Sequence, residues 1–326
     1  MSARDDLTMR RCTRTALLSL PILVAVAITG CADSPVSTTG TETLVDGLNN
    51  PTGIAVLADG SIVVAESGAA RLVTVATDGS IAPLVTGFQL GTYFPYDIGP
   101  LSVHMAADGT IIVGEGGASI GRERISFFDA QGAALADLTL TPVGGGNFFG
   151  VAIHPLTMDL YVTSADRNKI FRASPTEGGG YDVPVEFMAD TTQAPIGRSA
   201  PTALAFEADG SLLVGFADDA GGAIVRLGTD TEGTTSVLAE IYDGSGIITG
   251  IALRPSDGNI FFTEYDPVRP DQGRVAGFTD EGGDRTALSN LTAPSALAFA
   301  PDDTLYIATL GDTPNGTAGA ILVVRS

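Results

Sequence analysis

The sequence contains little of what covalent and metal chemistry most often requires. It has two cysteines, two histidines and no tryptophan in 326 residues. Both cysteines, Cys12 and Cys31, lie near the start of the chain. A folded domain that begins after Cys31 therefore contains no thiol, which excludes disulfides, thiol catalysis and cysteine metal sites within that domain.

Basic side chains are also scarce. The chain has 17 Lys and Arg residues against 38 Asp and Glu residues, so its formal net charge is −21. Such an acidic surface repels phosphate backbones, and nucleic acid is therefore not an expected partner. The charge is typical of a protein that stays soluble, also in salty surroundings, and a cation-rich ligand is the more specific alternative.

The start of the chain has the layout of an export signal. Arg10, Arg11 and Arg14 precede an apolar run of 13 residues at 16–28, which is too short to span a bilayer comfortably. The run ends in Ile-Thr-Gly before Cys31. These four residues resemble the lipobox of bacterial lipoproteins, in which the cysteine receives diacylglycerol and becomes the mature N-terminus. An ordinary signal peptide or an uncleaved anchor is the alternative.

The sequence thus predicts a lipoprotein signal at residues 1–30, a polar flexible tether at 31–41 and a folded domain at 42–326. Cleavage removes four basic and two acidic residues. The mature chain then has 13 basic and 36 acidic residues and a net charge of −23. Lipid on Cys31 would hold the protein on a membrane of the bacterial cell envelope, on the periplasmic or the cell-surface side. We expect a monomer there.

A repeated unit fills the folded domain. Its first copy, residues 51–79, has three short runs of β-favouring residues, with Asp59-Gly60 as a hairpin turn between the first two. The unit recurs at intervals of 46 to 53 residues, counted between positions that match Pro51. Those positions are Pro100, Phe148, Pro201, Ile248 and Pro294. A period in the forties with about four strands per unit is typical of a β-propeller.

The predicted fold is all-β: a six-bladed β-propeller of four-stranded antiparallel blades, with strands a to d in each blade and strand a nearest the axis. Fourth strands are expected at residues 81–88, 133–141, 184–188, 236–242 and 286–291. The sixth unit has none, because the chain ends after its third strand. We expect Glu42 to Leu48 to complete the last blade as its outermost strand, which closes the ring and removes a free edge.

The middle of strand a carries a small residue in five blades, as expected where six sheets converge on one axis. The six residues are Ala55, His104, Ala152, Ala205, Ala252 and Ala298. His104 breaks this column in blade two alone and is therefore a candidate functional residue beside the channel. The other histidine, His154, lies where other copies have their a–b turn, and we expect it to stabilise that turn.

The end of strand b carries a second column, in which glutamate recurs: Glu66, Glu115, Ser164, Phe216, Glu264 and Thr309. The first residues of strand c are Arg71, Arg124, Lys169, Ala223, Arg274 and Ala320. Glutamate and arginine occur in the same three blades, which indicates ion pairs within blades. Lys169 is expected to pair with Asp166 instead. The alternative is that Glu66, Glu115 and Glu264 bind a divalent cation, Ca²⁺ or Zn²⁺, or act as acids and bases.

The unit PTGIAVLADGSIVVAESGAARL resembles the NHL repeat and the six-bladed regucalcin/gluconolactonase-like and strictosidine synthase-like propellers, over residues 42–325. Relatives of the gluconolactonase branch take metal ligands from residues that open strand a. The matching residues here are Thr52, Leu101, Phe149, Thr202, Thr249 and Ser295, and none is a carboxylate or an amide. Asn50 and Asn147 lie one or two places earlier. A quinone-dependent sugar dehydrogenase would need a cationic, histidine-rich channel, which two histidines do not supply.

Three long connections are candidates for a ligand-binding rim, at residues 89–99, 191–199 and 265–273. The candidate residues, with the channel histidine, are Tyr93, Phe94, Tyr96, Asp97, His104, Arg198, Tyr265, Asp266 and Arg269. Aromatic groups with scattered charges on a concave rim are typical of sites for peptides, glycans or small molecules. The aromatic residues would equally serve to plug the mouth of the channel.

The first functional hypothesis from the sequence is a non-catalytic module of the cell envelope that binds a protein, glycan or small-molecule ligand or acts as a scaffold. The alternative is an enzyme of the gluconolactonase/strictosidine synthase-like kind, a metal-dependent lactonase, another hydrolase or a lyase. It would use Glu66, Glu115, Glu264 and His104 around a cation in the channel.

Overall fold

The computed structural model describes residues 41–93, 95–117, 123–219, 221–229, 235–278 and 283–325. They belong to one compact unit, Val36–Ser326. The predicted signal, the lipidation of Cys31 and all but the end of the tether lie outside the described residues and stay predictions. Within the described ranges, no helix has the length and apolar character needed to cross a membrane.

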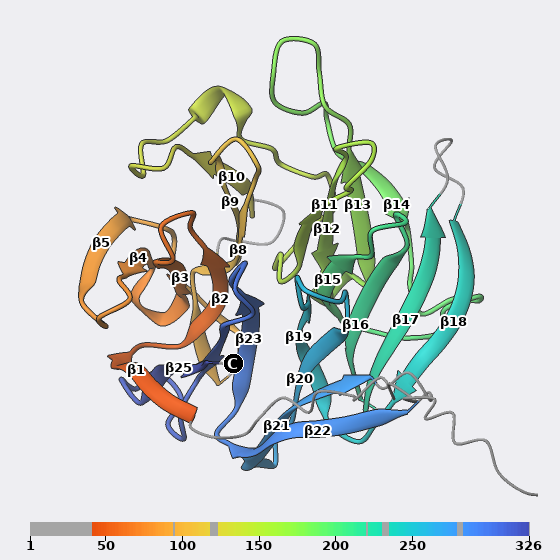
Figure 1. Cartoon of the computed structure of the whole chain (residues 1–326). Coiled ribbons are helices and arrows are strands. Elements are labelled where there is room, and N and C mark those ends of the chain that lie inside the picture. The colour runs from red at the N-terminus through yellow and green to blue at the C-terminus, as the bar shows by residue number, and fades with distance from the viewer. Residues whose placement is uncertain are drawn as a thin grey trace, which may run out of the picture. The chain divides into compact units, whose positions relative to one another are not determined.

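Six antiparallel sheets form the blades of a propeller (Figure 1). Blade one contains β2 (Pro51–Val56), β3 (Ile62–Glu66), β4 (Arg71–Val75) and β5 (Ile81–Thr86). Blade two contains β8 (Pro100–Met105), β9 (Ile111–Glu115) and β10 (Ile125–Phe128). Blade three contains β11 (Val151–Ile153), β12 (Leu160–Ser164), β13 (Lys169–Ala173) and β14 (Val185–Met188).

The second half of the ring repeats this arrangement. Blade four contains β15 (Pro201–Phe206), β16 (Leu212–Asp218), β17 (Gly221–Thr229) and β18 (Thr235–Asp243). Blade five contains β19 (Ile247–Leu253), β20 (Ile260–Asp266), β21 (Arg269–Phe278) and β22 (Asp284–Leu291). Blade six contains β23 (Pro294–Phe299), β24 (Leu305–Thr309), β25 (Gly319–Val324) and β1 (Thr41–Leu48). The predicted six-bladed fold is confirmed.

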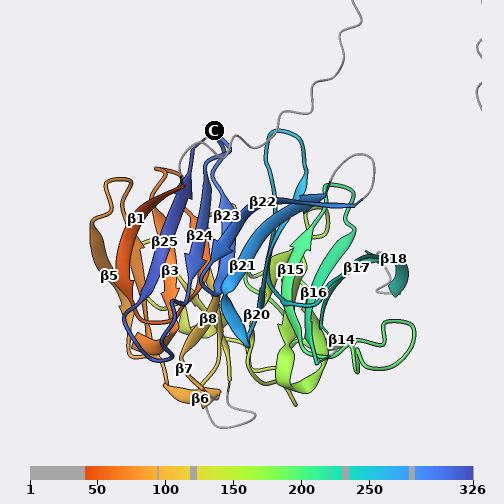
Figure 2. The ribbon, with the colours of Figure 1, turned by 90° about the horizontal axis from the view of Figure 1, so that it is seen from below.

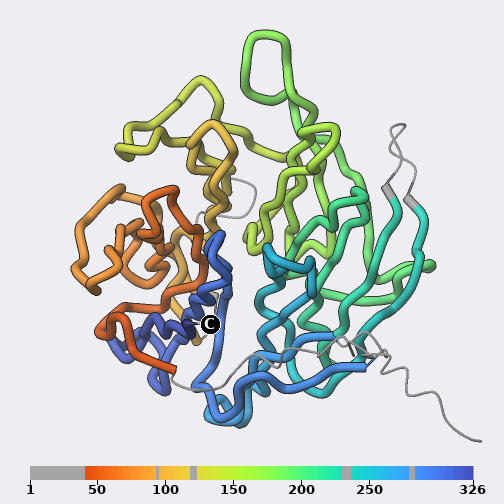
Figure 3. The backbone as a smooth tube through the Cα atoms, in the orientation of Figure 1, coloured from red at the N-terminus to blue at the C-terminus, as the bar shows by residue number. Residues whose placement is uncertain are grey.

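The last blade is closed by the N-terminal strand, as predicted. Its strands follow the order β1-β25-β24-β23, and Figure 2 shows them side by side. Thr41 lies opposite Val324, and Leu48 lies opposite Gly319. In Figure 3 the red start of β1 accordingly runs beside the blue C-terminal strand. Leu48 is buried in a core cluster with side chains of blade one and blade six, so the first strand also seals the junction of these two blades.

Blade two departs from the prediction of a fourth strand at residues 133–141. The segment makes only isolated bridges to β10, between Phe128 and Ala134 and between Ile125 and Leu140. Between the bridges it leaves the extended conformation and forms the 3₁₀ helix η2 (Ala136–Leu138). The segment therefore covers the edge of β10 at two points without a continuous ladder, because a helical turn cannot continue strand pairing.

The core lies between the blades. Six clusters of buried apolar side chains each join two neighbouring blades; the cluster between blades one and two, for example, contains Val63, Leu72, Val103 and Ile111. Strands with apolar residues on both faces are expected when sheets pack against neighbours on both sides. This packing leaves the inner edges of the six strands nearest the axis to line a channel.

Short connections follow the sequence signals. In the first a–b turn, Gly60 has a φ of 82°, which glycine adopts without steric cost, and the Asp59 carboxylate accepts a hydrogen bond of 3.0 Å from the Ser61 N–H. In blade three, His154 takes the place of the aspartate that accepts this hydrogen bond. Its Nδ1 accepts hydrogen bonds of 3.1 Å from the N–H groups of Leu156 and Thr157. The expected turn role of His154 is therefore present.

Candidate active site

The central channel encloses about 480 Å³ and is lined by the first strand of every blade. The predicted column of small residues lies in this lining: Ala55, Ala152, Ala205, Ala252 and Ala298, with His104 in blade two. The alanines leave the space that larger side chains would fill. Because the volume is within the range of small-molecule sites, roughly 300–1,000 Å³, the channel is the natural candidate site.

His104 lies on β8, paired with Ile112 of β9, and is one of the residues that line this space. Among the described residues that line the channel it is the only ionisable one, since no Asp, Glu, Lys or Arg is present. Burial lowers the pKa of His104 from 6.5 to about 4. The imidazole is therefore neutral at pH 7 and can accept a proton.

The polar side chains of the lining are hydroxyls, and each donates a hydrogen bond to a backbone carbonyl of the next blade. The bonds run from Thr52 to Pro100 (3.3 Å), Ser102 to Phe148 (3.0 Å), Thr202 to Ile248 (2.6 Å) and Thr249 to Pro294 (2.7 Å). Ser295 makes the same contact, 2.5 Å, to Pro51. We call these five residues the hydroxyl belt. Four of them, all but Ser102, occupy the repeat position at which the gluconolactonase branch has metal ligands. Hydroxyl residues at one repeat position were the signal in the sequence for a shared structural role.

The three glutamates of the second column form the expected ion pairs. Glu66 pairs with Arg71 at 2.5 Å, Glu115 with Arg124 at 3.4 Å and Glu264 with Arg274 at 2.7 Å. Each carboxylate accepts a further hydrogen bond: Glu66 from the Asn49 N–H, Glu115 from the Ser126 hydroxyl and Glu264 from the Gly246 N–H. Their charges are thus compensated within the blades and their immediate surroundings, and none of the three lines the channel.

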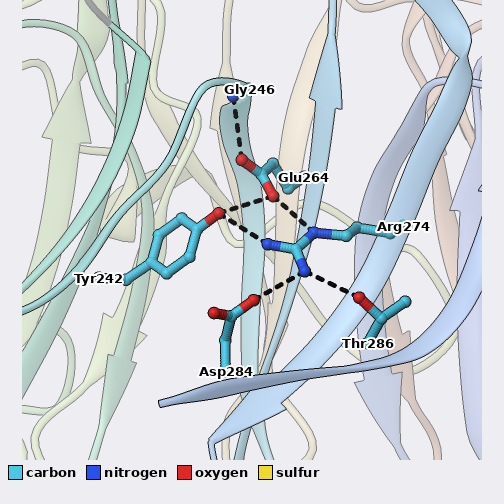
Figure 4. A network of polar contacts seen from close by, with 6 residues as sticks. All are labelled: Tyr242, Gly246, Glu264, Arg274, Asp284 and Thr286. Atoms are coloured by element: carbon cyan, nitrogen blue, oxygen red, sulfur yellow. Dashed lines mark hydrogen bonds and ion pairs between the residues drawn. The ribbon is translucent and has the colours of Figure 1, made fainter.

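Figure 4 shows the most extensive of these networks. Arg274 donates to Glu264, to the Tyr242 hydroxyl at 2.7 Å and to Thr286, and it pairs with Asp284 at 2.7 Å. The Tyr242 hydroxyl in turn donates a hydrogen bond of 2.8 Å to Glu264. Burial, followed by this bond to the carboxylate, raises the pKa of Tyr242 well above its usual value. The network joins the outer strand of blade four to blade five.

A divalent cation does not fit the described residues. No group of three or more His, Cys, Asp or Glu side chains that could hold a metal ion occurs among them. The three predicted glutamate ligands point to arginines in separate blades, and His104 is the only imidazole or carboxylate in the described lining. The metal-dependent form of the enzyme alternative therefore has no set of ligands here.

The expected pair of Lys169 and Asp166 is wrong. Lys169 pairs with Glu186 on β14, the strand beside β13, because a carboxylate on the neighbouring strand is closer than one in the b–c turn. Asp166 lies in the 3₁₀ helix η3 (Ala165–Arg167), and its carboxylate is 4.0 Å from the Arg167 guanidinium.

Charged candidate residues of the rim pair with neighbouring charges. Arg198 pairs with Glu240 at 2.9 Å and with Asp243 at 3.0 Å, while Arg269 pairs with Asp266 at 2.9 Å. None of these charged residues is among those that line the channel, whereas His104 is. Phe94 and the side chain of Tyr93 lie outside the part of the chain that the structure describes.

Tyr96 and Tyr265 do lie together. Tyr96 belongs to the hairpin of β6 (Gly91–Tyr93) and β7 (Tyr96–Ile98), seen at the lower end of the ring in Figure 2, and packs on a cluster of Tyr265, Ala293 and Leu310. The Asp97 N–H donates a hydrogen bond of 2.5 Å to the Asn315 side chain, which anchors the hairpin to blade six. The hairpin thus reaches from the junction of blades one and two to blades five and six.

Comparisons with known proteins show which solved structures share this architecture. No family model matches the sequence, and no curated protein matches it. Among solved structures, a PQQ-bound aldose sugar dehydrogenase from Streptomyces coelicolor is 18% identical, with a TM-score of 0.63 over 86% of this chain and 96% of that one. A gluconolactonase from Xanthomonas campestris is 16% identical, with a TM-score of 0.60 over 87% and 89%.

A virginiamycin B lyase from Staphylococcus aureus is a third neighbour. It is 15% identical, with a TM-score of 0.55 over 88% of this chain and 99% of that one. That structure holds quinupristin, and the enzyme in it is a histidine-to-alanine variant described as catalytically inactive. At such identities the likeness establishes the fold: this chain has the six-bladed architecture of the gluconolactonase-like propellers.

The first functional hypothesis from the sequence, a non-catalytic binding or scaffold module, is contradicted by these comparisons. The neighbours are a dehydrogenase, a lactonase and a lyase, all of them enzymes. The glutamates pair with arginines of their own blades and do not line the channel. That pairing removes the glutamates from the candidate chemistry but leaves the channel and His104.

Proposed function

We propose that this protein is an enzyme that acts on a small molecule in the central channel, and that its reaction is a lyase-type ring opening with His104 as the general base. The observation that carries the proposal is the neutral imidazole of His104 in a channel with no other ionisable side chain among its described lining residues. Support comes from the enzymes of the same fold, one of which is a lyase described as inactive when a histidine is replaced.

The proposed step requires only a base and a substrate with an acidic C–H next to an ester C–O bond. The imidazole takes the proton, the C–H electron pair forms a C=C bond, and the C–O bond breaks with loss of a carboxylate. The imidazolium formed is then the only cation among the described lining residues, so it is placed to pair with the departing carboxylate.

A lactone hydrolase is the second candidate, favoured by the gluconolactonases among the structural neighbours. There His104 would take a proton from water as the water oxygen attacks the ester carbonyl; the ring C–O bond would then break, and the imidazolium would return the proton to the leaving alkoxide. The described residues supply no metal ligands for the metal-dependent version of this reaction. The same lack of cationic groups in the described lining gives no support to a PQQ-dependent dehydrogenase.

One assay separates these reactions. The purified full chain is incubated with a panel of small uncharged cyclic esters, and the products are separated by liquid chromatography and identified by mass spectrometry. Elimination opens a ring without a change in mass, whereas hydrolysis adds the mass of one water. We expect the first result, unaffected by EDTA; turnover that adds water supports the second candidate, and no turnover of any cyclic ester contradicts both.

His104→Ala is the matched variant. It gives blade two the residue that the other five blades have at this position, so the fold is expected to tolerate it. Loss of one general base typically lowers a rate by about 10²–10⁴-fold. Turnover that survives in His104→Ala at the rate of the unaltered protein would place the chemistry elsewhere.

A further inference from the structure

We propose that the channel selects neutral ligands that carry hydrogen-bond donors, such as amide N–H or hydroxyl groups on an apolar frame, and rejects carboxylates and ammonium groups. The inference shares with the proposed function only the assumption that the channel is the binding site. It concerns which molecules enter, whatever reaction follows.

The hydroxyl belt sets the polarity of the channel. Thr52, Ser102, Thr202 and Thr249 each donate their only O–H to a backbone carbonyl of the next blade. A hydroxyl whose proton is committed offers a ligand only its oxygen lone pairs. The side chains around the described lining therefore present hydrogen-bond acceptors, and the neutral imidazole of His104 is the one side chain able to donate through nitrogen.

An anion finds no cationic side chain among the described residues of such a lining. A buried carboxylate needs several donors or a cation, and the described lining has no Lys or Arg. The protein's net charge of −21 adds a long-range repulsion.

A cation is disfavoured as well, because no carboxylate is present among the described lining residues to pair with it. Burial is the sole cause of the depressed pKa of His104, with no carboxylate close enough to oppose it. An ammonium group at the same depth would lose its hydration in the same way and would also find no carboxylate among the described lining residues. Neutral donors avoid both penalties and satisfy the acceptors that the belt presents.

The rest of the ligand is expected to be apolar. Apolar residues such as Ile54, Val103, Leu204, Phe206 and Phe299 line the same space. Such surfaces bind by removal of apolar area from water. The cavity of about 480 Å³ accommodates an eight-carbon chain with a small polar head group.

A matched series of eight-carbon compounds tests the inference on the full chain. Octanamide is neutral with donors, methyl octanoate is neutral without donors, octanoate is an anion and octylammonium is a cation at pH 7. By isothermal titration calorimetry, we expect octanamide to bind more tightly than either ion by about tenfold or more, and more tightly than the ester. Equal or tighter binding of either ion, binding of the ester as tight as that of the amide, or no binding of octanamide would overturn the proposal.

A pair of variants shows whether the channel is the place of selection. Ala252→Arg adds a cation to the alanine column, and Ala252→Gln adds a neutral side chain of similar length. We expect octanoate to gain about tenfold or more in affinity in the arginine variant alone, since only there does the anion acquire a partner. An equal gain in both variants, or in neither while both remain folded, contradicts the inference. None of the probes needs to react, so a failure here and a lack of turnover in the ring-opening assay are separate results.

Discussion

The hydroxyl of Ser295 donates a hydrogen bond of 2.5 Å to the backbone carbonyl of Pro51, which joins the last blade to the first at the inner edge of the ring. At the outer edge the same two blades are joined by β1, which completes blade six and buries Leu48. The ring is thus closed at its inner and its outer edge by segments that lie far apart in the sequence. Neither closure depends on the candidate active site, so each can be disturbed without touching His104.

The inner closure predicts the behaviour of Ser295→Ala. Removal of the hydroxyl deletes one buried hydrogen bond between blades, and we expect a loss of about 1–2 kcal/mol in the free energy of unfolding. Urea denaturation followed by circular dichroism measures this value. Ser289→Ala, at an exposed position of β22, is the control and should change stability by less than about 0.5 kcal/mol. Equal effects of the two variants would show that the belt contributes nothing beyond an ordinary hydroxyl.

The outer closure predicts a larger effect for Leu48→Ala. Leu48 is 1% exposed and touches the cores of blades one and six, so truncation leaves a cavity and should cost about 2–5 kcal/mol. Leu238 on β18 is 54% exposed, and Leu238→Ala should cost far less. Thermal unfolding by calorimetry compares the two variants. If Leu48→Ala destabilised the protein no more than Leu238→Ala does, the packing of β1 would not be needed to hold the ring closed.

Glu264→Gln tests whether the glutamate column is structural. The change removes the charge that faces Arg274 and Tyr242, and we expect a loss of about 1–3 kcal/mol on unfolding in urea. Glu240→Gln is the control. The Glu240 side chain, which pairs with Arg198, is 41% exposed, so this change should cost about 0–1 kcal/mol. Addition of Ca²⁺ or Zn²⁺ should leave the melting temperature of the unaltered protein unchanged. A rise that disappears in Glu264→Gln would instead restore the metal interpretation.

The sequence predicted what depends on the repeat. The register of strand a, the closure by β1 and the glutamate–arginine pairs all follow from comparing one copy with another, because equivalent residues meet equivalent neighbours. The failures lie where one blade differs from the rest. Residues 133–141 were expected to form a strand but are interrupted by η2, and Lys169 pairs with Glu186 on the adjacent strand. The contact of Tyr96 with Tyr265 could not be predicted, since it joins two irregular connections far apart in the chain.

The depressed pKa of His104 predicts a dependence of stability on pH. The unfolded chain binds a proton on this residue below about pH 6.5, whereas the folded protein does so only below about 4. Between these values the unfolded state binds more protons, so the His104 contribution falls as the pH falls. At about 1.4 kcal/mol per pH unit, the loss amounts to about 3 kcal/mol between pH 6.5 and 4.

His104→Ala isolates this contribution, because carboxylates elsewhere titrate equally in both proteins. Urea denaturation at pH 7, 5.5 and 4.5 should show the difference in stability between the variant and the unaltered protein shifting in favour of the variant as the pH falls. The rate of ring opening, which needs the neutral imidazole, should persist at pH 5 and fall only near 4. A constant difference in stability, with activity lost near pH 6.5, would mean that the imidazole is hydrated in the channel, and the case for neutral ligands would fall with it.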